Sequence, residues 1–340
     1  MKLRKLGNSE LEISPVILGT WALGGWLWGG TEKNNAEQAI QASINAGINC
    51  IDTAPAYGFG LSEELVGKSI RGRRDSLIIA TKCGLVWDGR KGSTKFFESK
   101  DNNGKPITVN RCLSKKSILM ECDASLKRLG VDVIDLYQCH WPDPSASIEE
   151  TVEAFSVLKE KGKIRAWGTS NFSIAQIEEW IKYAPLSSDQ PKYSLLSRDI
   201  ENDILPFCEK NNIGVICYSP MEMGILAGKI GMDKAFPDND TRQNRPWFQP
   251  EKRQEVLNAL EKIRPIAEQH NVSLGNIAVA WTFHQPGVTA AIVGARDGNQ
   301  AKINALAADI TLSNEDLGTI RAAFAHLKLD QPYDPATAKR

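Results

Sequence analysis

The chain has 340 residues, of which 42% are hydrophobic and 24% charged, so it can bury a sizeable core and is not expected to be disordered. Its 41 basic residues balance 41 acidic ones, which excludes the strong field that attracts nucleic acid or an anionic membrane. The seven cysteines form no CxxC pair, and the chain has neither a signal-like segment nor an 18-residue apolar run. We therefore expect a reduced, cytoplasmic, globular protein with no nucleic-acid or membrane partner.

The N-terminal residues predict a short hairpin followed by a repeating unit of strand and helix. Residues 3–15 alternate around a Gly-Asn-Ser turn, and Val16-Ile17-Leu18 is the first buried strand. Residues 34–46 carry apolar side chains at helical spacing and end at a glycine. The next strand, residues 48–52, completes the unit.

The same unit continues along the whole chain. Further strands are predicted at residues 77–82, 133–139, 164–168, 186–190, 213–218 and 289–293. Further helices are predicted near residues 62–70, 114–129, 148–160, 173–183, 203–211, 251–270 and 299–307. Eight strands that alternate with helices predict a closed (β/α)8 TIM barrel, in one domain over residues 1–340 because no linker divides it. The alternative is an open doubly wound sheet, but no GxGxxG fingerprint follows the first strand.

Three connections are too long to be simple turns: residues 20–33, 83–113 and 219–250. Each follows the carboxyl end of a predicted strand, so in a barrel all three crowd the C-terminal face. The polar tail beyond about residue 326 either folds over that face or stays mobile.

Polar side chains end three of the apolar strands. Asp52, Lys82 and His140 each close a strand, and Tyr57 follows Asp52 in a glycine-containing loop. Taken singly, these residues have structural explanations, such as a cap, a packed aromatic or a solvated cation. Parallel α/β folds build active sites at the carboxyl ends of their strands, so together the residues predict an acid-base site.

These residues lie in motifs through which the chain resembles the aldo-keto reductases over essentially its whole length. The motifs are GTWALGG at 19–25, IDTAPAYGFGLSEELVGK at 51–68, IATK at 79–82, SLKRLGVDVIDLYQCHWPD at 125–143, GKIRAWGTSNF at 162–172, YSPMEMGILAGK at 218–229 and VGARDGNQAKIN at 293–304. Within that superfamily the chain is similar to the bacterial branch related to the potassium-channel beta-subunit-like and inositol-catabolism-type reductases.

The resemblance implies reversible hydride transfer between a nicotinamide cofactor and a carbonyl group. It assigns Tyr57 as the proton donor, Lys82 and Asp52 as the pair that tunes it, and His140 as carbonyl orienter and proton relay. A phenol with its usual pKa of about 10 is a weak acid at neutral pH, so we expect the Lys82 ammonium to lower the pKa of Tyr57.

The resemblance also implies the cofactor site. Ser170, Asn171 and Gln190 would bind the nicotinamide carboxamide, and Tyr218 would stack on its ring. The residues that would wrap the pyrophosphate are Ser219, Pro220, Met221, Gly224, Leu226, Gly228 and Lys229. The residues that would face the adenine are Gln300 and Asn304. The other expected cofactor residues are Gly19, Thr20, Trp21, Asp52, Gly294 and Arg296. Alternatively, Ser170 and Asn171 cap a helix and Arg296 is a surface charge. Since Arg296 suits a 2′-phosphate, we expect NADPH/NADP+ rather than NADH.

Tryptophans are concentrated in the loops of the predicted active face. Trp21, Trp26, Trp28, Trp87 and Trp141 lie there, with Phe59, Phe96 and Phe97 nearby. Flat aromatic walls suit a ring-shaped ligand such as a sugar, cyclitol, terpenoid or aryl carbonyl. The expected substrate pocket comprises Trp21, Trp28, Tyr57, Trp87, His140 and Trp141, with no metal.

The sequence therefore predicts an NADPH-dependent enzyme that reduces an aldehyde or ketone, acts on a small-molecule carbonyl or alcohol, and is a monomer or weak homo-oligomer. One alternative is a cofactor-binding, redox-sensing regulatory subunit resembling channel beta subunits. That branch typically adds an N-terminal extension, whereas this chain starts at its hairpin. A cofactor-free lyase or isomerase would leave Ser170, Asn171, Gln190, Arg296 and Asn304 unexplained.

Overall fold

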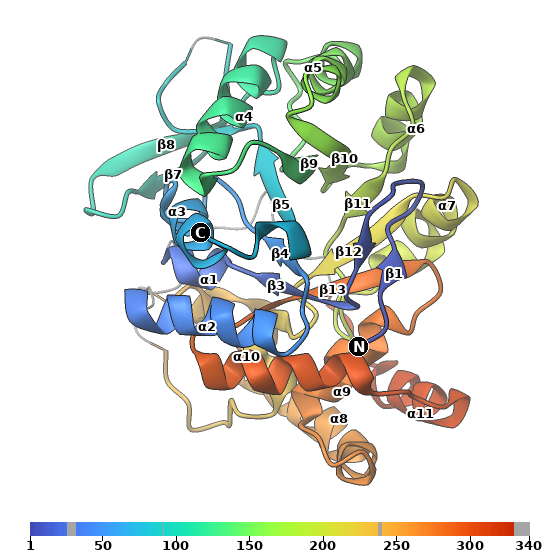
Figure 1. Ribbon diagram of the computed structural model, residues 1–340. Helices are drawn as coiled ribbons and strands as arrows, with labels where there is room; N and C mark the ends of the chain where they lie inside the picture. The colour runs from blue at the N-terminus through green and yellow to red at the C-terminus, as the bar shows by residue number, and fades with distance from the viewer. Residues whose placement is uncertain (26–31, 91, 237–239, 330–340) are drawn as a thin grey trace.

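The computed structural model describes residues 1–25, 32–90, 92–236 and 240–329. Eight parallel strands close into a barrel in the order β10-β11-β12-β13-β3-β4-β5-β9, which confirms the predicted TIM-barrel fold (Figure 1). The strands are β3 (Val16–Gly19), β4 (Cys50–Asp52), β5 (Ile78–Cys83), β9 (Ile134–Cys139), β10 (Ile164–Ser170), β11 (Ser188–Gln190), β12 (Gly214–Tyr218) and β13 (Val288–Gly294).

Helices surround the barrel on its outer side (Figure 1). They are α2 (Lys33–Asn45), α3 (Leu61–Ser69), α4 (Lys115–Leu129), α5 (Ile148–Glu160), α6 (Ile174–Tyr183), α7 (Ile204–Lys210), α8 (Pro250–Gln269), α9 (Leu274–Phe283), α10 (Gly298–Ala305) and α11 (Asn314–Phe324). Serine side chains cap five of them by accepting a backbone N–H of the first turn: Ser114, Ser147, Ser173, Ser273 and Ser313. None of the helices in the described segments is long and apolar enough to cross a membrane.

The N-terminal hairpin is present as predicted. Its strands β1 (Arg4–Lys5) and β2 (Glu12–Ile13) pair antiparallel. Leu6, Leu11 and Ile13 of the hairpin pack with the inward-facing residues of the barrel, among them Ile17 and Leu136. The hairpin therefore fills one end of the barrel with apolar side chains and leaves the polar strand ends at the other.

Two helices and one sheet go beyond the sequence prediction. Helix α9 is buried on every side, so it has no polar face whose spacing would reveal a helix. The connection 83–113 holds a three-stranded antiparallel sheet of β6 (Leu85–Val86), β7 (Thr94–Lys100) and β8 (Pro106–Arg111), in the order β6-β8-β7. Helix α11, which lies between the last predicted helix and the predicted tail, packs against α8.

The other two long connections are partly helical. The first contains the short helix α1 (Trp21–Gly24), and the last contains the 3-10 turns η3 (Glu222–Ala227), η4 (Thr241–Asn244) and η5 (Pro246–Phe248). Further 3-10 turns are η1 (Arg74–Ser76), η2 (Asp199–Asn202) and η6 (Leu306–Asp309). All seven cysteines lie in described segments, where they are buried and free, as expected of packing residues.

Candidate active site

A cavity of about 500 Å³ lies at the carboxyl ends of the barrel strands. Most of the residues predicted for the site line it: Gly19, Thr20, Trp21, Asp52, Tyr57, His140, Trp141, Ser170, Asn171, Gln190, Tyr218, Ser219, Pro220, Met221, Gly224, Lys229, Gly294, Arg296, Gln300 and Asn304. Residues from seven of the eight strand ends and from the connection 219–250 thus share one cavity.

Five predicted residues are not among those that line the cavity. Lys82 lies beneath its surface and is fully buried. Leu226 is also fully buried, and Gly228, which ends the same turn, is not a lining residue either. Trp87 packs edge-to-face on Phe59, with ring centroids 5.1 Å apart, rather than forming a wall of the cavity. Trp28, like Trp26, falls outside the described residues.

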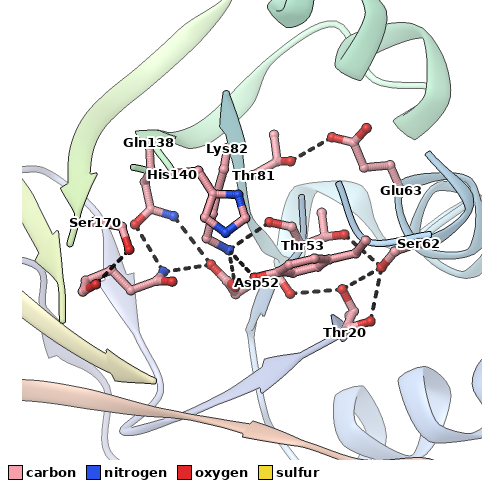
Figure 2. Close-up of polar contacts among 12 residues, drawn as sticks. Thr20, Asp52, Thr53, Ser62, Glu63, Thr81, Lys82, Gln138, His140 and Ser170 are labelled. Carbon is pink, nitrogen blue, oxygen red and sulfur yellow. Dashed lines mark hydrogen bonds and ion pairs between the residues drawn. The ribbon is translucent and has the colours of Figure 1, made fainter. Parts of the chain in front are cut away.

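The Lys82 ammonium joins two other members of the predicted acid-base site, Asp52 and Tyr57. Lys82 Nζ donates to Asp52 Oδ1 at 2.5 Å, to the Thr53 carbonyl at 3.0 Å and to the Tyr57 hydroxyl at 3.1 Å. Lys82 is fully buried and Asp52 is 2% exposed, so water does not screen this ion pair. Figure 2 shows Lys82 pointing at Asp52, with His140 close by. The fold therefore connects a carboxylate, an ammonium and a phenol in series.

Burial and charge act in opposite directions on this series. For Lys82, burial favours the neutral amine, but the Asp52 carboxylate and Tyr57 outweigh it and raise the pKa of the ammonium. For Tyr57, burial outweighs the opposing charge of Lys82, so the pKa of the phenol is raised. The expected lowering of that pKa is therefore wrong as a net effect, although Lys82 itself acts in the expected direction. Both groups carry their protons at neutral pH.

Aromatic rings surround the phenol where it meets the cavity. The His140 ring stands edge-on to Tyr57, with centroids 5.6 Å apart and planes at 83°. Trp21 stacks on the other side at 6.2 Å. The loop that carries Tyr57 approaches helix α1 so closely that a Cβ at Gly58 would lie 2.1 Å from the Gly24 carbonyl oxygen. Two glycines thus allow the backbone contact that fixes Tyr57.

Side-chain amides hold the second oxygen of the carboxylate. Gln190 donates to Asp52 Oδ2 at 2.9 Å and Gln138 at 3.4 Å. Gln138 was not predicted, although a polar residue two positions before His140 in an apolar strand must point to the same side of the sheet. Gln190, predicted to bind a nicotinamide carboxamide, lines the cavity and contacts Asp52. Both carboxylate oxygens are therefore hydrogen-bonded.

The other predicted amide site is also hydrogen-bonded to the residues around His140. Asn171 Nδ2 donates to the His140 carbonyl at 3.0 Å and to Ser170 Oγ at 3.0 Å. The Tyr218 hydroxyl donates to Asn171 Oδ1 at 2.9 Å, and Ser170 Oγ donates to the Gln190 carbonyl at 2.7 Å. These contacts hold the ends of β10, β11 and β12 in a fixed arrangement next to His140.

Hydroxyl groups behind the site lock the strands that carry it. Ser62 of α3 donates to Thr20 Oγ1 at 2.7 Å and contacts the Thr53 hydroxyl at 2.9 Å (Figure 2). Thr81, next to Lys82, donates to the buried Glu63 carboxylate at 2.6 Å. Because hydroxyls on neighbouring elements interlock, the position of Lys82 does not depend on its own contacts alone.

Positive charge is concentrated in the other half of the cavity. Arg296, just before α10, shares the lining with Arg242 and Arg245 from the connection 219–250. Burial and then the charge of Arg242 lower the pKa of Arg296, while Asp240, which pairs with Arg242 at 2.6 Å, opposes them. Two arginines held close enough to repel each other form a site suited to an anion.

Several lining residues were missed by sequence reasoning. They are Lys192, Glu222, Arg242, Arg245, Trp247 and Phe248. Most lie in irregular segments, where no period fixes which side chain faces inward. For Arg242 and Arg245, the sequence showed only that they lie in the long polar connection after β12. Gln300 and Asn304, predicted at an adenine site, also stabilise their own turn: Gln300 accepts the Arg296 N–H at 3.1 Å and Asn304 donates to the Gly294 carbonyl at 3.0 Å.

Both the sequence and the fold of the chain match known proteins. The model of the Aldo/keto reductase family matches residues 15–325. The chain is 40% identical to aldo-keto reductase YhdN of Bacillus subtilis, over 98% of this chain and 97% of the relative. It is 38% identical to the NADH-specific methylglyoxal reductase of Escherichia coli, over 94% and 98%. The solved glycerol dehydrogenase AKR11B4 of Gluconobacter oxydans matches with a TM-score of 0.86 and 37% identity, over 98% of each chain.

Proposed function

The chain belongs to the aldo/keto reductase family, and we propose that it is an NADPH-dependent reductase that converts an aldehyde or ketone to the alcohol. The observation that carries this proposal is the buried series Asp52–Lys82–Tyr57, whose phenol end meets the cavity beside His140. A carboxylate, an ammonium and a phenol in this order are the groups needed to deliver a proton to a carbonyl oxygen.

Each side chain then has one role in the reduction. The Tyr57 hydroxyl donates its proton to the carbonyl oxygen. Burial raises the pKa of the phenol, so the hydroxyl is protonated at neutral pH and its donation depends on the opposing charge of Lys82. Lys82 stabilises the phenolate that forms, and Asp52 keeps Lys82 charged. His140, edge-on to Tyr57, orients the carbonyl group.

The residues of the cavity fit a nicotinamide dinucleotide. When bound, such a cofactor supplies the hydride. Ser170, Asn171 and Gln190 offer hydroxyl and amide groups for a carboxamide, and Tyr218 offers an aromatic face. The arginines in the other half of the cavity suit phosphate groups, because a bound negative charge offsets the repulsion between the guanidinium groups.

The proposed preference for NADPH rests on Arg296 and Arg242. The E. coli relative is NADH-specific by name, so membership of the family does not decide the cofactor. A 2′-phosphate adds negative charge that a ribose hydroxyl does not have, and two adjacent guanidinium groups favour the more highly charged ligand.

The proposed substrate is a ring-shaped carbonyl compound or the corresponding alcohol, such as a sugar, a cyclitol or another cyclic carbonyl compound. Trp21, Leu85 and Trp141 line the cavity with Tyr57 and His140, so apolar and aromatic surfaces surround the proposed reaction centre. Flat walls of this kind pack against a ring better than against a flexible chain.

The test combines cofactor binding with a panel of carbonyl compounds. We expect NADPH to bind more tightly than NADH, and at least one small aldehyde and one cyclic ketone to be reduced, measured as loss of NADPH absorbance. Tight NADPH binding with no turnover of any aldehyde or ketone would contradict the enzymatic proposal and favour a cofactor-sensing subunit. The protein without substrate gives the background rate of cofactor oxidation.

A further inference from the structure

The turn after β12 has an unusual backbone. Ser219, Glu222 and Met223 have φ values of 59°, 42° and 52°, and Gly224 follows at 95°. Left-handed backbone is unfavourable for residues other than glycine, and three such residues within five positions persist only where the surroundings hold them. The same turn lines the cavity from Ser219 to Gly224.

The buried carboxylate of Glu222 holds the turn in this shape. Glu222 is 4% exposed, and its Oε1 accepts from Ser194 Oγ at 3.0 Å, from Ser197 Oγ at 2.6 Å and from Lys192 Nζ at 2.9 Å. All three donors come from the segment that follows β11. One ammonium and two hydroxyl groups from another part of the chain thus all donate to a single oxygen of Glu222.

The segment that supplies these donors is itself rigid. Ser194 and Ser197 exchange two backbone hydrogen bonds, at 3.1 and 3.2 Å. Tyr193, between the donors, is fully buried and stacks on Trp281 of α9 at 5.5 Å. Glu222 is therefore bound to a rigid segment, residues 192–197. These contacts outside the turn offset the backbone strain within it.

We propose that Glu222 is a positioning residue for the cofactor, which with Lys192, Ser194 and Ser197 holds the turn 219–224 in the shape that receives the pyrophosphate. The inference rests on the proposed function. It differs from the role of Arg296, because NADPH and NADH share the pyrophosphate but differ at the 2′ position. Loss of Glu222 should therefore weaken both cofactors equally.

The test measures the affinity of both cofactors in Glu222→Ala and Glu222→Gln. For Glu222→Ala we expect NADPH and NADH to bind about tenfold more weakly, with kcat at saturating cofactor within about twofold of wild type, because a relaxed turn must be reordered on binding. Glu222→Gln keeps an acceptor for the two serines and should lose less. Should Glu222→Ala not fold, the glutamine variant still gives the comparison.

A matched control is a second glutamate that contacts the same segment, residues 192–197. Glu201 accepts from the Tyr193 hydroxyl at 2.7 Å and pairs with Arg198, but it does not line the cavity. Glu201→Gln should keep wild-type affinity for both cofactors even where it lowers the melting temperature.

Three outcomes overturn the inference: unchanged affinity in both Glu222 variants, an equal loss in Glu201→Gln, or a loss confined to NADPH. A wild-type protein that binds neither cofactor would instead overturn the proposed function itself.

Discussion

The Lys82 ammonium touches both Asp52 and Tyr57 and is fully buried. Among the described residues, only these two groups and the Thr53 carbonyl solvate its charge. Such a pair gives little net stability, but removing one partner leaves an uncompensated charge in a dry site. At the scale of single residues, stability and the proposed chemistry therefore depend on the same contacts, and variants must separate the two.

Tyr57→Phe separates them most simply, because it removes one hydroxyl and keeps the ring that packs against Trp21 and His140. We expect normal folding and cofactor binding, with kcat for carbonyl reduction lowered roughly 100-fold or more, the contribution of a general acid. Steady-state kinetics on any substrate from the panel provide the measurement. Activity above about a tenth of wild type would rule out Tyr57 as the proton donor.

Lys82→Met should lower both activity and stability. The variant leaves Asp52 buried without its counter-ion, which costs about 3–5 kcal/mol of unfolding free energy when a buried pair is broken. The double variant Asp52→Asn/Lys82→Met should regain much of that stability but none of the activity. Urea unfolding and kinetics of the three proteins check this. A double variant no more stable than Lys82→Met would show that the ion pair is not the source of the loss.

Arg296→Ala tests the choice of cofactor. A charge-assisted contact to a 2′-phosphate is worth about 1.5–3 kcal/mol, so NADPH affinity should fall about 10-fold or more while NADH stays within about threefold. Titrations must share one ionic strength because salt screens the contact. Lys302→Ala, an exposed charge removed from α10 outside the cavity, is the control. Equal losses for both cofactors would assign Arg296 a structural role.

At the scale of elements, the sheet within the connection 83–113 packs against Trp141, one wall of the cavity. The ring centroids of Phe96 in β7 and of Trp141, which lines the cavity, are 5.3 Å apart. The Cζ atom of the Arg111 guanidinium lies 4.9 Å from the centroid of the Phe96 ring. The sequence TKFFESK alternates partly between polar and apolar residues, which is typical of a strand. The local pattern does not determine the register in which β7 pairs with β8. Of the tryptophans predicted at this face, Trp21 and Trp141 line the cavity and Trp87 does not, and the sequence could not distinguish them.

Phe96→Ala should therefore alter substrate selection without altering cofactor binding. The aromatic contact is worth about 0.5–1.5 kcal/mol, so we expect the KM for a cyclic ketone to rise about threefold or more as Trp141 loses its support. The KM for a small aldehyde should change less. Lys100→Ala, which removes an exposed side chain from the same strand, serves as the control. An unchanged KM for every cyclic substrate would mean that Trp141 keeps its position without Phe96.

At the scale of the whole molecule, the barrel divides its two ends between stability and chemistry. The hairpin closes one end with Leu6, Leu11 and Ile13, and the other end collects polar groups from strands far apart in sequence. Strand and helix alternation was enough to predict this plan, because each βα unit carries its own apolar periodicity. It was not enough for α9, which is apolar on all sides, nor for Arg242 and Arg245, whose direction depends on tertiary contacts.

One property of the whole molecule follows from a buried acid behind the site. Asp189 of β11 is fully buried; its Oδ1 accepts from Thr169 at 2.8 Å, and its Oδ2 has no hydrogen-bond partner among the described residues. Burial raises the pKa of this carboxyl group to about 7. The unfolded chain loses the proton near pH 4, so between about pH 4 and pH 7 the folded protein holds a proton that the unfolded chain has released.

The free energy of unfolding therefore falls as pH rises through this window, by on the order of 3–4 kcal/mol from this group, and does not change further above it. Asp189→Asn mimics the protonated acid at every pH. Relative to wild type, the variant should gain that amount between pH 4 and pH 8, measured by urea unfolding at each pH. Glu121, whose pKa burial also raises to about 7, is present in both proteins, so its contribution cancels from the difference. Parallel stability curves for the two proteins would mean that Asp189 is ionised in the folded state and that its charge is compensated within the barrel wall.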